Sequence, residues 1–311
     1  MIVDTHTHLW QNLDQLGPQI SAQLRQQAAG PWEQMDASPH NHEAAMHCVD
    51  AAFVLGFRSR MLGADVPNQL LAAYVASNPD KLIGFAGIDP MVRGWQDELE
   101  QLTNIGMSGV VISPAEQGYH PTHSEAMKLY ERCQALGLPV VVHQGNPFAR
   151  DSMLEHARPY LFDEVARCFP RLRLMLTQCG HPWMEETLVV VSKHRNIFAG
   201  LSGIILRPWQ LYNLLLQAHQ LDVTDRLLLG SDFPHASPEY AIEMIYTVNR
   251  FAQGTAVPSV PREKLRAIVE RNALEAMGLA AGPSGSGIRP QAPRALPRSA
   301  GHSAGALHER S

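Results

Sequence analysis

The chain has 311 residues, of which 45% are hydrophobic and 18% charged, and its net charge is −5 at pH 7. A chain of this size can bury a large core, and its acidic balance excludes the broad basic surface that binds nucleic acid or anionic membranes. The four cysteines have no CxxC spacing, and the N-terminus lacks the basic and apolar regions of a signal peptide. We therefore expect a cytoplasmic protein with no nucleic-acid and no membrane partner.

The first ten residues predict a short buried strand that carries His6 and His8 two positions apart. Successive side chains of a strand alternate between its faces, so these two imidazoles should project together from the strand end. Neutral imidazole suits zinc, iron, nickel and manganese-like ions. Taken alone, the pair is equally a chance placement in a chain with 15 histidines.

Residues 10–39 are polar and mixed, with Gly-Pro and Ser-Pro pairs as turn signals. This composition predicts a long loop directly after the histidine pair. Long loops in compact domains are usually lids or disordered segments. Trp10 and Trp32 favour a lid packed over a pocket, although they would serve equally as simple anchors for the loop.

Beyond this loop and a helix predicted at 42–50, short apolar runs alternate with amphipathic segments. Counting the first strand, eight strands are predicted, the others at residues 51–55, 82–88, 109–112, 139–143, 172–177, 196–201 and 226–230. The helices between them are predicted at 67–77, 94–105, 124–136, 162–168, 184–193, 208–219 and 238–251. Eight such units over about 250 residues indicate an α/β protein with a (β/α)₈, or TIM, barrel. No GxGxxG follows the first strand, which speaks against a dinucleotide-binding sheet.

The last part of the chain changes in composition. Residues 261–279 predict one extra C-terminal helix, packed outside the barrel or across its base. Residues 280–311 contain mainly Pro, Gly, Ser, Ala and Arg, with almost no apolar bulk. Such a segment cannot bury enough surface to order itself. We therefore assign a barrel to 1–279 and a disordered tail to 280–311, with a basic interaction arm as the alternative.

Polar residues stand at three of the predicted strand ends, where a TIM barrel places its active site. The first strand ends with His6 and His8, the fifth with His143 and the eighth with Asp232. One histidine at a strand end is more often a core or rim residue than a ligand. Together, however, these strand ends would bring nitrogen and oxygen donors to one mouth, which is the plan of a catalytic metal centre.

Several segments carry a family resemblance: His6-Thr7-His8, His143, Gly230-Ser231-Asp232-Phe233-Pro234 and, more weakly, Gly118-Tyr119, Gly180-His181-Pro182-Trp183, Leu201-Ser202-Gly203 and Glu270-Arg271-Asn272-Ala273. In order and spacing they resemble the amidohydrolase superfamily. The closest resemblance is to its amidohydrolase-related branch, which includes aminocarboxymuconate semialdehyde decarboxylase and related aromatic-acid decarboxylases.

The resemblance implies one divalent metal ion, zinc or alternatively manganese, held by His6, His8, His143 and Asp232. No lysine ends the fourth or fifth strand, so a carbamylated lysine that bridges two metal ions is not expected. A mononuclear centre follows.

The chain departs from the branch after the sixth strand. Relatives usually carry a histidine there that activates the metal-bound water, and this chain has Gln178. An amide does not titrate usefully, so Gln178 cannot act as a general base. Three interpretations stay open: His181 takes the catalytic role, Gln178 only orients water or substrate, or the chemistry is reduced or lost.

Three further residues are candidates for substrate binding. Arg207 would bind a substrate carboxylate bidentately, but it would equally cap a helix or pair with an acid. His235 follows Asp232 closely and would reach the substrate unless it is an ordinary rim histidine. Trp10 belongs to the predicted lid.

These residues support a metal-dependent hydrolase. The metal would lower the pKa of a bound water, Asp232 would accept its proton, and the water would attack an amide, lactone or ester of a small carboxylated substrate. The second hypothesis is nonoxidative decarboxylation of a small aromatic or unsaturated acid. A third, from another class, is a non-catalytic barrel that binds metal or ligand. A homodimer is compatible with the sequence.

Overall fold

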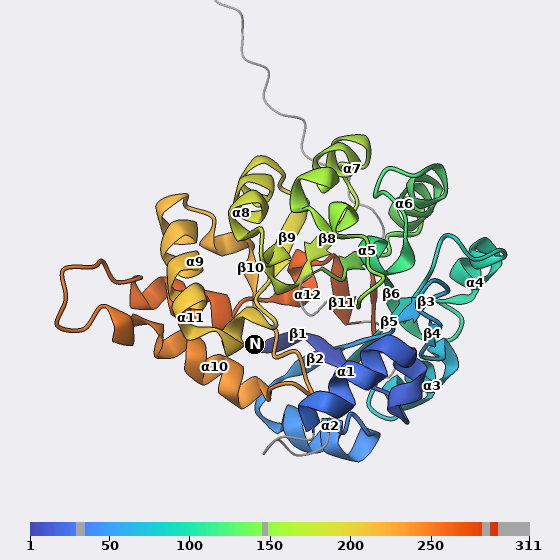
Figure 1. Ribbon diagram of the computed structural model, residues 1–311, viewed down its shortest axis with the longest axis horizontal. Helices are drawn as coiled ribbons and strands as arrows, with labels where there is room; N and C mark the ends of the chain where they lie inside the picture. The colour runs from blue at the N-terminus through green and yellow to red at the C-terminus, as the bar shows by residue number, and fades with distance from the viewer. Residues whose placement is uncertain (29–34, 145–148, 282–286, 292–311) are drawn as a thin grey trace, which may run out of the picture.

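The computed structural model describes residues 1–28, 35–144, 149–281 and 287–291. Eight strands form one parallel sheet, in the order β1 (Val3–His8), β2 (Ala51–Leu55), β5 (Leu82–Gly87), β6 (Met107–Ile112), β7 (Val140–Val142), β8 (Leu174–Leu176), β9 (Ile197–Gly200) and β10 (Leu227–Leu228). Backbone bonds then join the two edges, because Thr5 donates to the Leu229 carbonyl and His8 to that of Phe233, each at 2.9 Å. The predicted TIM barrel is confirmed (Figure 1).

Helices surround the strands as the alternating pattern predicts. They are α2 (Pro39–Ala45), α3 (Asn68–Val75), α4 (Trp95–Gln101), α5 (Pro114–Gln117), α6 (Ser124–Leu136), α7 (Phe162–Cys168), α8 (Met184–Lys193), α9 (Pro208–Gln220) and α10 (Pro238–Tyr246). A small antiparallel pair that the sequence did not reveal, β3 (Arg58–Ser59) and β4 (Ala64–Asp65), follows β2. In the described part of the chain, no helix is both long and apolar enough to cross a lipid bilayer.

Two apolar layers hold the barrel. One lies between strands and helices, and the other fills the barrel interior with buried side chains from alternate strand positions, such as Phe53, Phe85 and Phe198. The rings of Phe53 and Phe85 lie 4.7 Å apart, centroid to centroid. Gly109 makes room for them, because a Cβ at this position would lie 2.3 Å from the Phe85 ring. The interior is therefore a packed core below the mouth.

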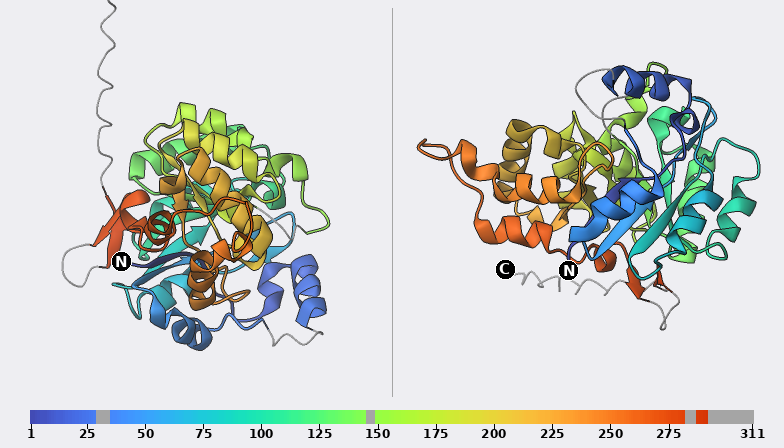
Figure 2. Two further views of the ribbon diagram at one scale, coloured as in Figure 1. Left: turned by 90° about the vertical axis from the view of Figure 1, so that its left-hand side faces the viewer. Right: turned by 90° about the horizontal axis from the view of Figure 1, so that it is seen from below.

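The segment after β1 contains a helix that we did not predict. Residues 10–39 were expected to form a loop, but they include a 3₁₀ turn, η1 (Leu13–Leu16), and the α-helix α1 (Pro18–Ala28). Gly17 ends the turn with φ 80°, and Pro18 starts the helix, where its missing N–H costs nothing. Figure 2 shows α1, in dark blue, at one end of the barrel. Trp32 lies outside the described residues.

The C-terminal part differs from the predicted single helix. It forms two helices, α11 (Arg262–Val269) and α12 (Ala273–Ala276); Asn272 caps the second by accepting a bond from the Glu275 backbone N–H. A strand pair follows, β11 (Leu279–Ala281) with β12 (Ile288–Pro290). Both strands lie at the end of the barrel opposite α1 (Figure 2).

The predicted disorder of residues 280–311 is therefore wrong where β12 is described, while 282–286 and 292–311 lie outside the described residues. The Ile288 side chain is 8% exposed and packs with Met277 and Leu279 beneath the barrel interior. The Ser108 hydroxyl donates to the Ile288 carbonyl at 2.7 Å. The pairing with β11, the hydrogen bonds of this segment and one buried apolar side chain together hold it against the barrel.

We expect Ile288→Ala to destabilise the barrel, because it removes apolar surface from this closed layer. Large-to-small changes in a core cost about 2 kcal/mol or more, which corresponds to a melting temperature lower by roughly 4 °C or more. Thermal unfolding followed by circular dichroism measures this difference. Val257→Ala, at a position that is 43% exposed, is the control and should leave the melting temperature unchanged. An unchanged value for Ile288→Ala would show that β12 does not contribute to stability.

Candidate metal centre and active site

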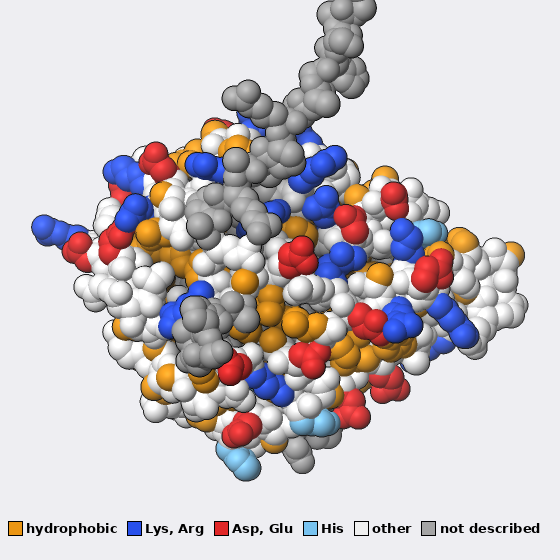
Figure 3. Space-filling model, turned by 180° about the vertical axis from the view of Figure 1, so that it is seen from behind, with side chains coloured by type: hydrophobic (Ala, Val, Ile, Leu, Met, Phe, Trp, Pro, Cys, Tyr) orange, Lys and Arg blue, Asp and Glu red, His pale blue; other side chains and the backbone are white. Residues whose placement is uncertain are grey.

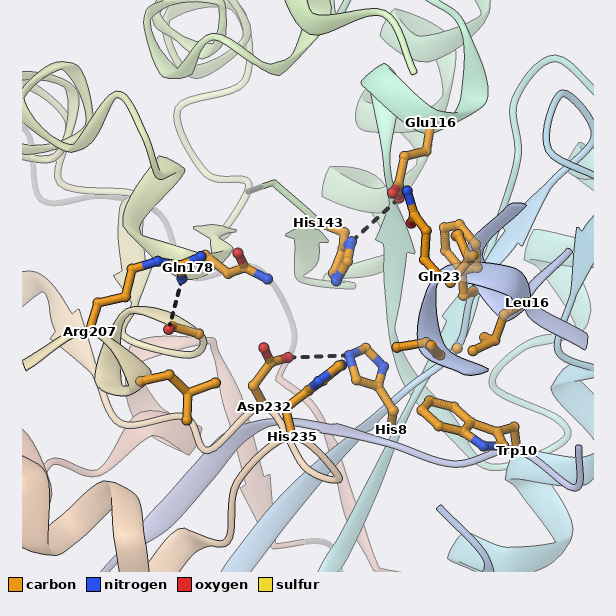
Figure 4. Close-up of a pocket in the computed structure, with 16 residues that line it drawn as sticks. His8, Trp10, Leu16, Gln23, Glu116, His143, Gln178, Arg207, Asp232 and His235 are labelled. Atoms are coloured by element: carbon orange, nitrogen blue, oxygen red, sulfur yellow. Dashed lines mark hydrogen bonds and ion pairs between the residues drawn. The ribbon is translucent and has the colours of Figure 1, made fainter. Parts of the chain in front are cut away.

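Four predicted ligands meet at the carboxyl ends of the barrel strands. His6 and His8 end β1, His143 follows β7 directly, and Asp232 comes four residues after β10. The Nε2 atoms of His6 and His8 lie 2.9 Å apart, and Asp232 Oδ1 lies 3.2 Å from the first and 3.6 Å from the second. The ligand atoms of His6, His8 and His143 are all within 4.8 Å of one another. Figure 4 shows His8, His143 and Asp232 converging on the same space.

The chemistry of this donor set fits a divalent metal ion. Three imidazoles and one carboxylate are the ligand types that zinc and related ions accept. The other ring nitrogen of His6, Nδ1, lies 2.9 Å from the Ser202 hydroxyl, so Nε2 remains for the centre. A hydrogen bond to the outer ring nitrogen is the usual way in which proteins orient a metal-binding histidine.

The protonation states of His6, His8 and Asp232 suit metal binding as well. Burial lowers the pKa of His6 well below its usual value, although Asp232 opposes this effect, and burial likewise lowers the pKa of His8. Burial raises the pKa of Asp232, yet the neighbouring His6 and His8 hold it below its usual range. Neutral imidazoles beside an ionised carboxylate are the forms that ligate a cation.

Backbone strain marks the loop that carries Asp232. This residue has φ 66°, a left-handed conformation that is uncommon outside glycine, and its N–H donates to the His6 carbonyl at 2.9 Å. The buried Asp4 carboxylate accepts the backbone N–H of His6 and of Ser231, each at 3.0 Å. Asp4 therefore ties the first ligand strand to the last ligand loop. Strained residues that are held this firmly often belong to functional sites.

A cavity of about 250 Å³ opens beside the four ligands. Its lining includes His8, His143 and Asp232 together with the predicted Trp10, Gln178, Arg207 and His235. The segment after β1 supplies one apolar wall through Leu16, Ile20 and Leu24, and the Trp10 ring stacks 6.2 Å from the His8 ring. The insertion thus forms one side of the pocket (Figure 4).

Residues 3–279 match the family model described as Amidohydrolase. The chain belongs to the amidohydrolase family. No curated protein matches it.

Solved structures share this fold. An uncharacterized TIM-barrel protein from Bordetella bronchiseptica is 20% identical, with a TM-score of 0.70 over 89% of this chain and 99% of that one. A probable 2-pyrone-4,6-dicarboxylic acid hydrolase from Acinetobacter baumannii is 16% identical, with a TM-score of 0.59 over 89% and 99%. A dihydroxybenzoic acid decarboxylase from Polaromonas sp. JS666, with bound manganese, is 16% identical, with a TM-score of 0.57 over 89% and 96%. At these identities the likeness shows the fold alone.

The structure places Gln178 and His181 differently. Gln178 lines the pocket from η5 (Thr177–Gly180), where it has φ 52° and its N–H donates to the Ser202 hydroxyl at 3.2 Å. His181 is 7% exposed and is not among the described residues that line the cavity. Burial lowers the pKa of His181, and the nearby Arg207 lowers it further. Gln178, rather than His181, is therefore the one in position to contact a bound molecule.

Arg207 and His235 also reach the cavity of this amidohydrolase. Arg207 precedes α9 but makes no side-chain bond to its first turn, and its Nη1 donates instead to the Gly203 carbonyl at 3.3 Å. The backbone N–H of His235 donates to the carbonyl of Asp232 at 2.8 Å, which holds His235 beside this candidate metal ligand.

Sequence reasoning missed Glu116, a buried carboxylate in the pocket lining that is 5% exposed. It lies on α5, and its Oε2 is 3.6 Å from His143 Nδ1, an ion-pair distance. Burial lowers the pKa of His143, but Glu116 and Asp232 raise it above its usual value. Ser113-Pro114-Ala115-Glu116 has the spacing of a helix capping box, which hides this role. In the structure the Ser113 hydroxyl donates to the Glu116 carboxylate, at 2.8 Å.

A buried histidine supports β1 from behind. Thr7 faces away from the pocket, and its hydroxyl donates to the Phe53 carbonyl at 2.6 Å. His42 Nε2, 2.7 Å from that hydroxyl, must therefore donate to it, while Nδ1 lies 2.9 Å from the Tyr74 hydroxyl. Burial favours the neutral form of His42 in this network.

We expect this network to make folding sensitive to acid. Burial lowers the pKa of His42 from its ordinary 6.5 to about 4. Below pH 6.5 the unfolded chain binds a proton at His42 that the folded chain does not bind. The contribution of His42 to stability is therefore fully present above pH 6.5 and is lost as the pH falls toward 4. Between about pH 7.5 and about pH 5, the free energy of unfolding should fall by about 2 kcal/mol more in the wild type than in His42→Gln. Denaturant titrations at each pH measure the free energy of unfolding, and the substitution of the exposed His47, His47→Gln, is the control. Parallel losses in wild type and His42→Gln would contradict the assignment.

Proposed function

We propose that this chain is a metal-dependent hydrolase that acts on an amide, lactone or ester of a small carboxylated substrate. The observation that carries the proposal is the convergence of His6, His8, His143 and Asp232 beside a partly apolar cavity. Zinc is the proposed ion, since imidazole nitrogens predominate, and manganese is the alternative. When bound, the ion would supply Lewis acidity and make water more acidic.

The residues of the chain would divide the remaining work. Asp232, held ionised, accepts the proton of the attacking water, and it lies close enough to His6 and His8 to do so beside the metal. Arg207 binds the substrate carboxylate through its guanidinium. Gln178 orients water or substrate, while Trp10 and His235 line the space around the reacting bond. The apolar wall excludes bulk water, which strengthens these charge interactions.

Decarboxylation of a small aromatic or unsaturated acid is the second candidate. It uses the same pocket and the same carboxylate contact. Gln178 does not separate it from hydrolysis, because the absence of a titrating group at that position weakens both candidates. A non-catalytic, metal-binding barrel is the third.

One experiment separates the three functions. Elemental analysis of the purified protein gives the metal content, and turnover is then screened on lactones, esters, amides and carboxylated aromatics, with and without added zinc or manganese. Hydrolysis releases an acid without gas, whereas decarboxylation releases carbon dioxide. Bound metal without any turnover over the whole panel would favour the non-catalytic barrel and overturn the proposal.

A further inference from the structure

The charges of the pocket are unevenly distributed. Among the described residues that line it, Arg207 is the one lysine or arginine, and Glu116 and Asp232 are the carboxylates. Figure 4 shows Arg207 and Glu116 on opposite sides, with His8, His143 and Asp232 between them. An anion in this cavity therefore meets a positive side and a negative side.

Arg207 has donors to spare. Its Nη1 donates to the Gly203 carbonyl at 3.3 Å, and no carboxylate of the described residues lies within ion-pair distance of the guanidinium. A guanidinium offers five N–H donors in a planar fork that matches one carboxylate. This side of the pocket can therefore hold one carboxylate group.

The opposite side would repel a second one. Glu116 is 5% exposed, and the Ser113 hydroxyl fixes its position. A like charge placed next to a buried carboxylate is strongly unfavourable, because little water is present to screen it. The apolar side chains of Leu16, Ile20 and Leu24 offer this second group no donor. Gln23, the polar residue on that wall, points toward Glu116 in Figure 4.

We infer that the pocket selects compact monocarboxylates and rejects dicarboxylates, with Glu116 as the residue that determines this specificity. The carboxylate lies against Arg207, and the apolar body of the molecule lies against the α1 wall. With a divalent ion in the metal centre, the charges of the ion, Asp232, Glu116 and Arg207 leave one positive charge, which a single carboxylate neutralises. The inference rests on the proposed function only in so far as both concern the same site.

The test compares three probes by isothermal titration calorimetry on the zinc-loaded protein: benzoate, 3-acetylbenzoate and isophthalate. 3-Acetylbenzoate matches isophthalate in size but carries one charge. In the wild type, benzoate and 3-acetylbenzoate should bind at least about tenfold more tightly than isophthalate. Glu116→Gln should reduce this preference to within about threefold, and Arg207→Gln should weaken all three probes.

Two controls separate charge from other effects. Glu155→Gln removes an exposed carboxylate from η3 (Leu154–Ala157), outside the pocket, and should leave the preference unchanged. Zinc content of Glu116→Gln, measured in parallel, shows whether the metal centre is intact, because Glu116 lies close to His143. If zinc is lost, the same comparison on the zinc-free wild type and Glu116→Gln should give the same change in preference.

Three results would overturn the inference: isophthalate binds the wild type as tightly as benzoate, the preference persists in Glu116→Gln, or no probe binds. A preference without turnover on any substrate would refute the proposed hydrolase and leave the inference standing. Turnover without the preference for monocarboxylates would refute the inference and leave the proposed hydrolase standing.

Discussion

Asp232→Asn should strip the protein of most of its metal and reduce turnover by on the order of a thousandfold, while the barrel stays folded. The substitution removes both an anionic ligand and the proposed proton acceptor, and general bases alone contribute about a hundredfold or more. Asparagine tolerates the left-handed φ of 66° at this position, so the backbone need not change. Elemental analysis and steady-state kinetics measure the two losses.

The chain offers a close control for this variant. Asp222 is an exposed aspartate that also has a left-handed φ, of 52°, and Asp222→Asn should keep both metal and turnover. His6→Ala provides a second route to the same conclusion, because it removes a ligand without touching the acceptor. Full metal occupancy in both Asp232→Asn and His6→Ala would eliminate the proposed ligand set.

Gln178→His should raise turnover, by about tenfold or more, or shift its pH optimum, because it restores a titrating group at a position that lines the pocket. Histidine is among the residues that accept a left-handed backbone, and Gln178 has φ 52°. His181→Ala should have a mild effect, since the described pocket does not include His181. Rate constants measured across the pH range test both variants.

The opposite pattern would reassign the catalytic role. If His181→Ala loses most of its turnover at unchanged metal content while Gln178→His gains nothing, His181 moves into the site during the reaction. Cys179→Ser is a suitable control, because Cys179 is buried between the two residues and burial raises its thiol pKa to about 12, so it supplies no thiolate.

The convergence of the four candidate metal ligands could be predicted from the sequence because the fold limits where strand ends go. Parallel strands of a closed barrel bring all their carboxyl ends to one mouth, so histidines after β1 and β7 and an aspartate after β10 must lie near one another. The strands themselves were visible as short apolar runs, and their order followed from the alternating helices. The topology of the barrel alone was enough to bring these side chains together.

The remaining features depend on contacts that no local pattern records. α1 has few apolar positions, and it is Ile20 and Leu24 that face the pocket, so its sequence looks like a polar loop. Glu116 has the spacing of a helix cap, and its proximity to His143 appears only once β6 and β7 are paired. Ile288 is a single apolar residue in a segment of low apolar content, so its docking under the barrel could not be inferred from composition.

The position of α1 in the chain matters for how this enzyme scaffold can diversify. The helix is an addition between β1 and β2, so it contributes no strand to the barrel and no ligand to the metal centre. Yet its side chains Ile20 and Leu24 form a wall of the pocket. We expect larger or smaller apolar residues there to change the length of molecule that fits, while the candidate ligands at the strand ends stay untouched. Selectivity for the length of the bound molecule is thus encoded apart from the candidate ligands, whereas selectivity for its charge would rest with Glu116, beside His143.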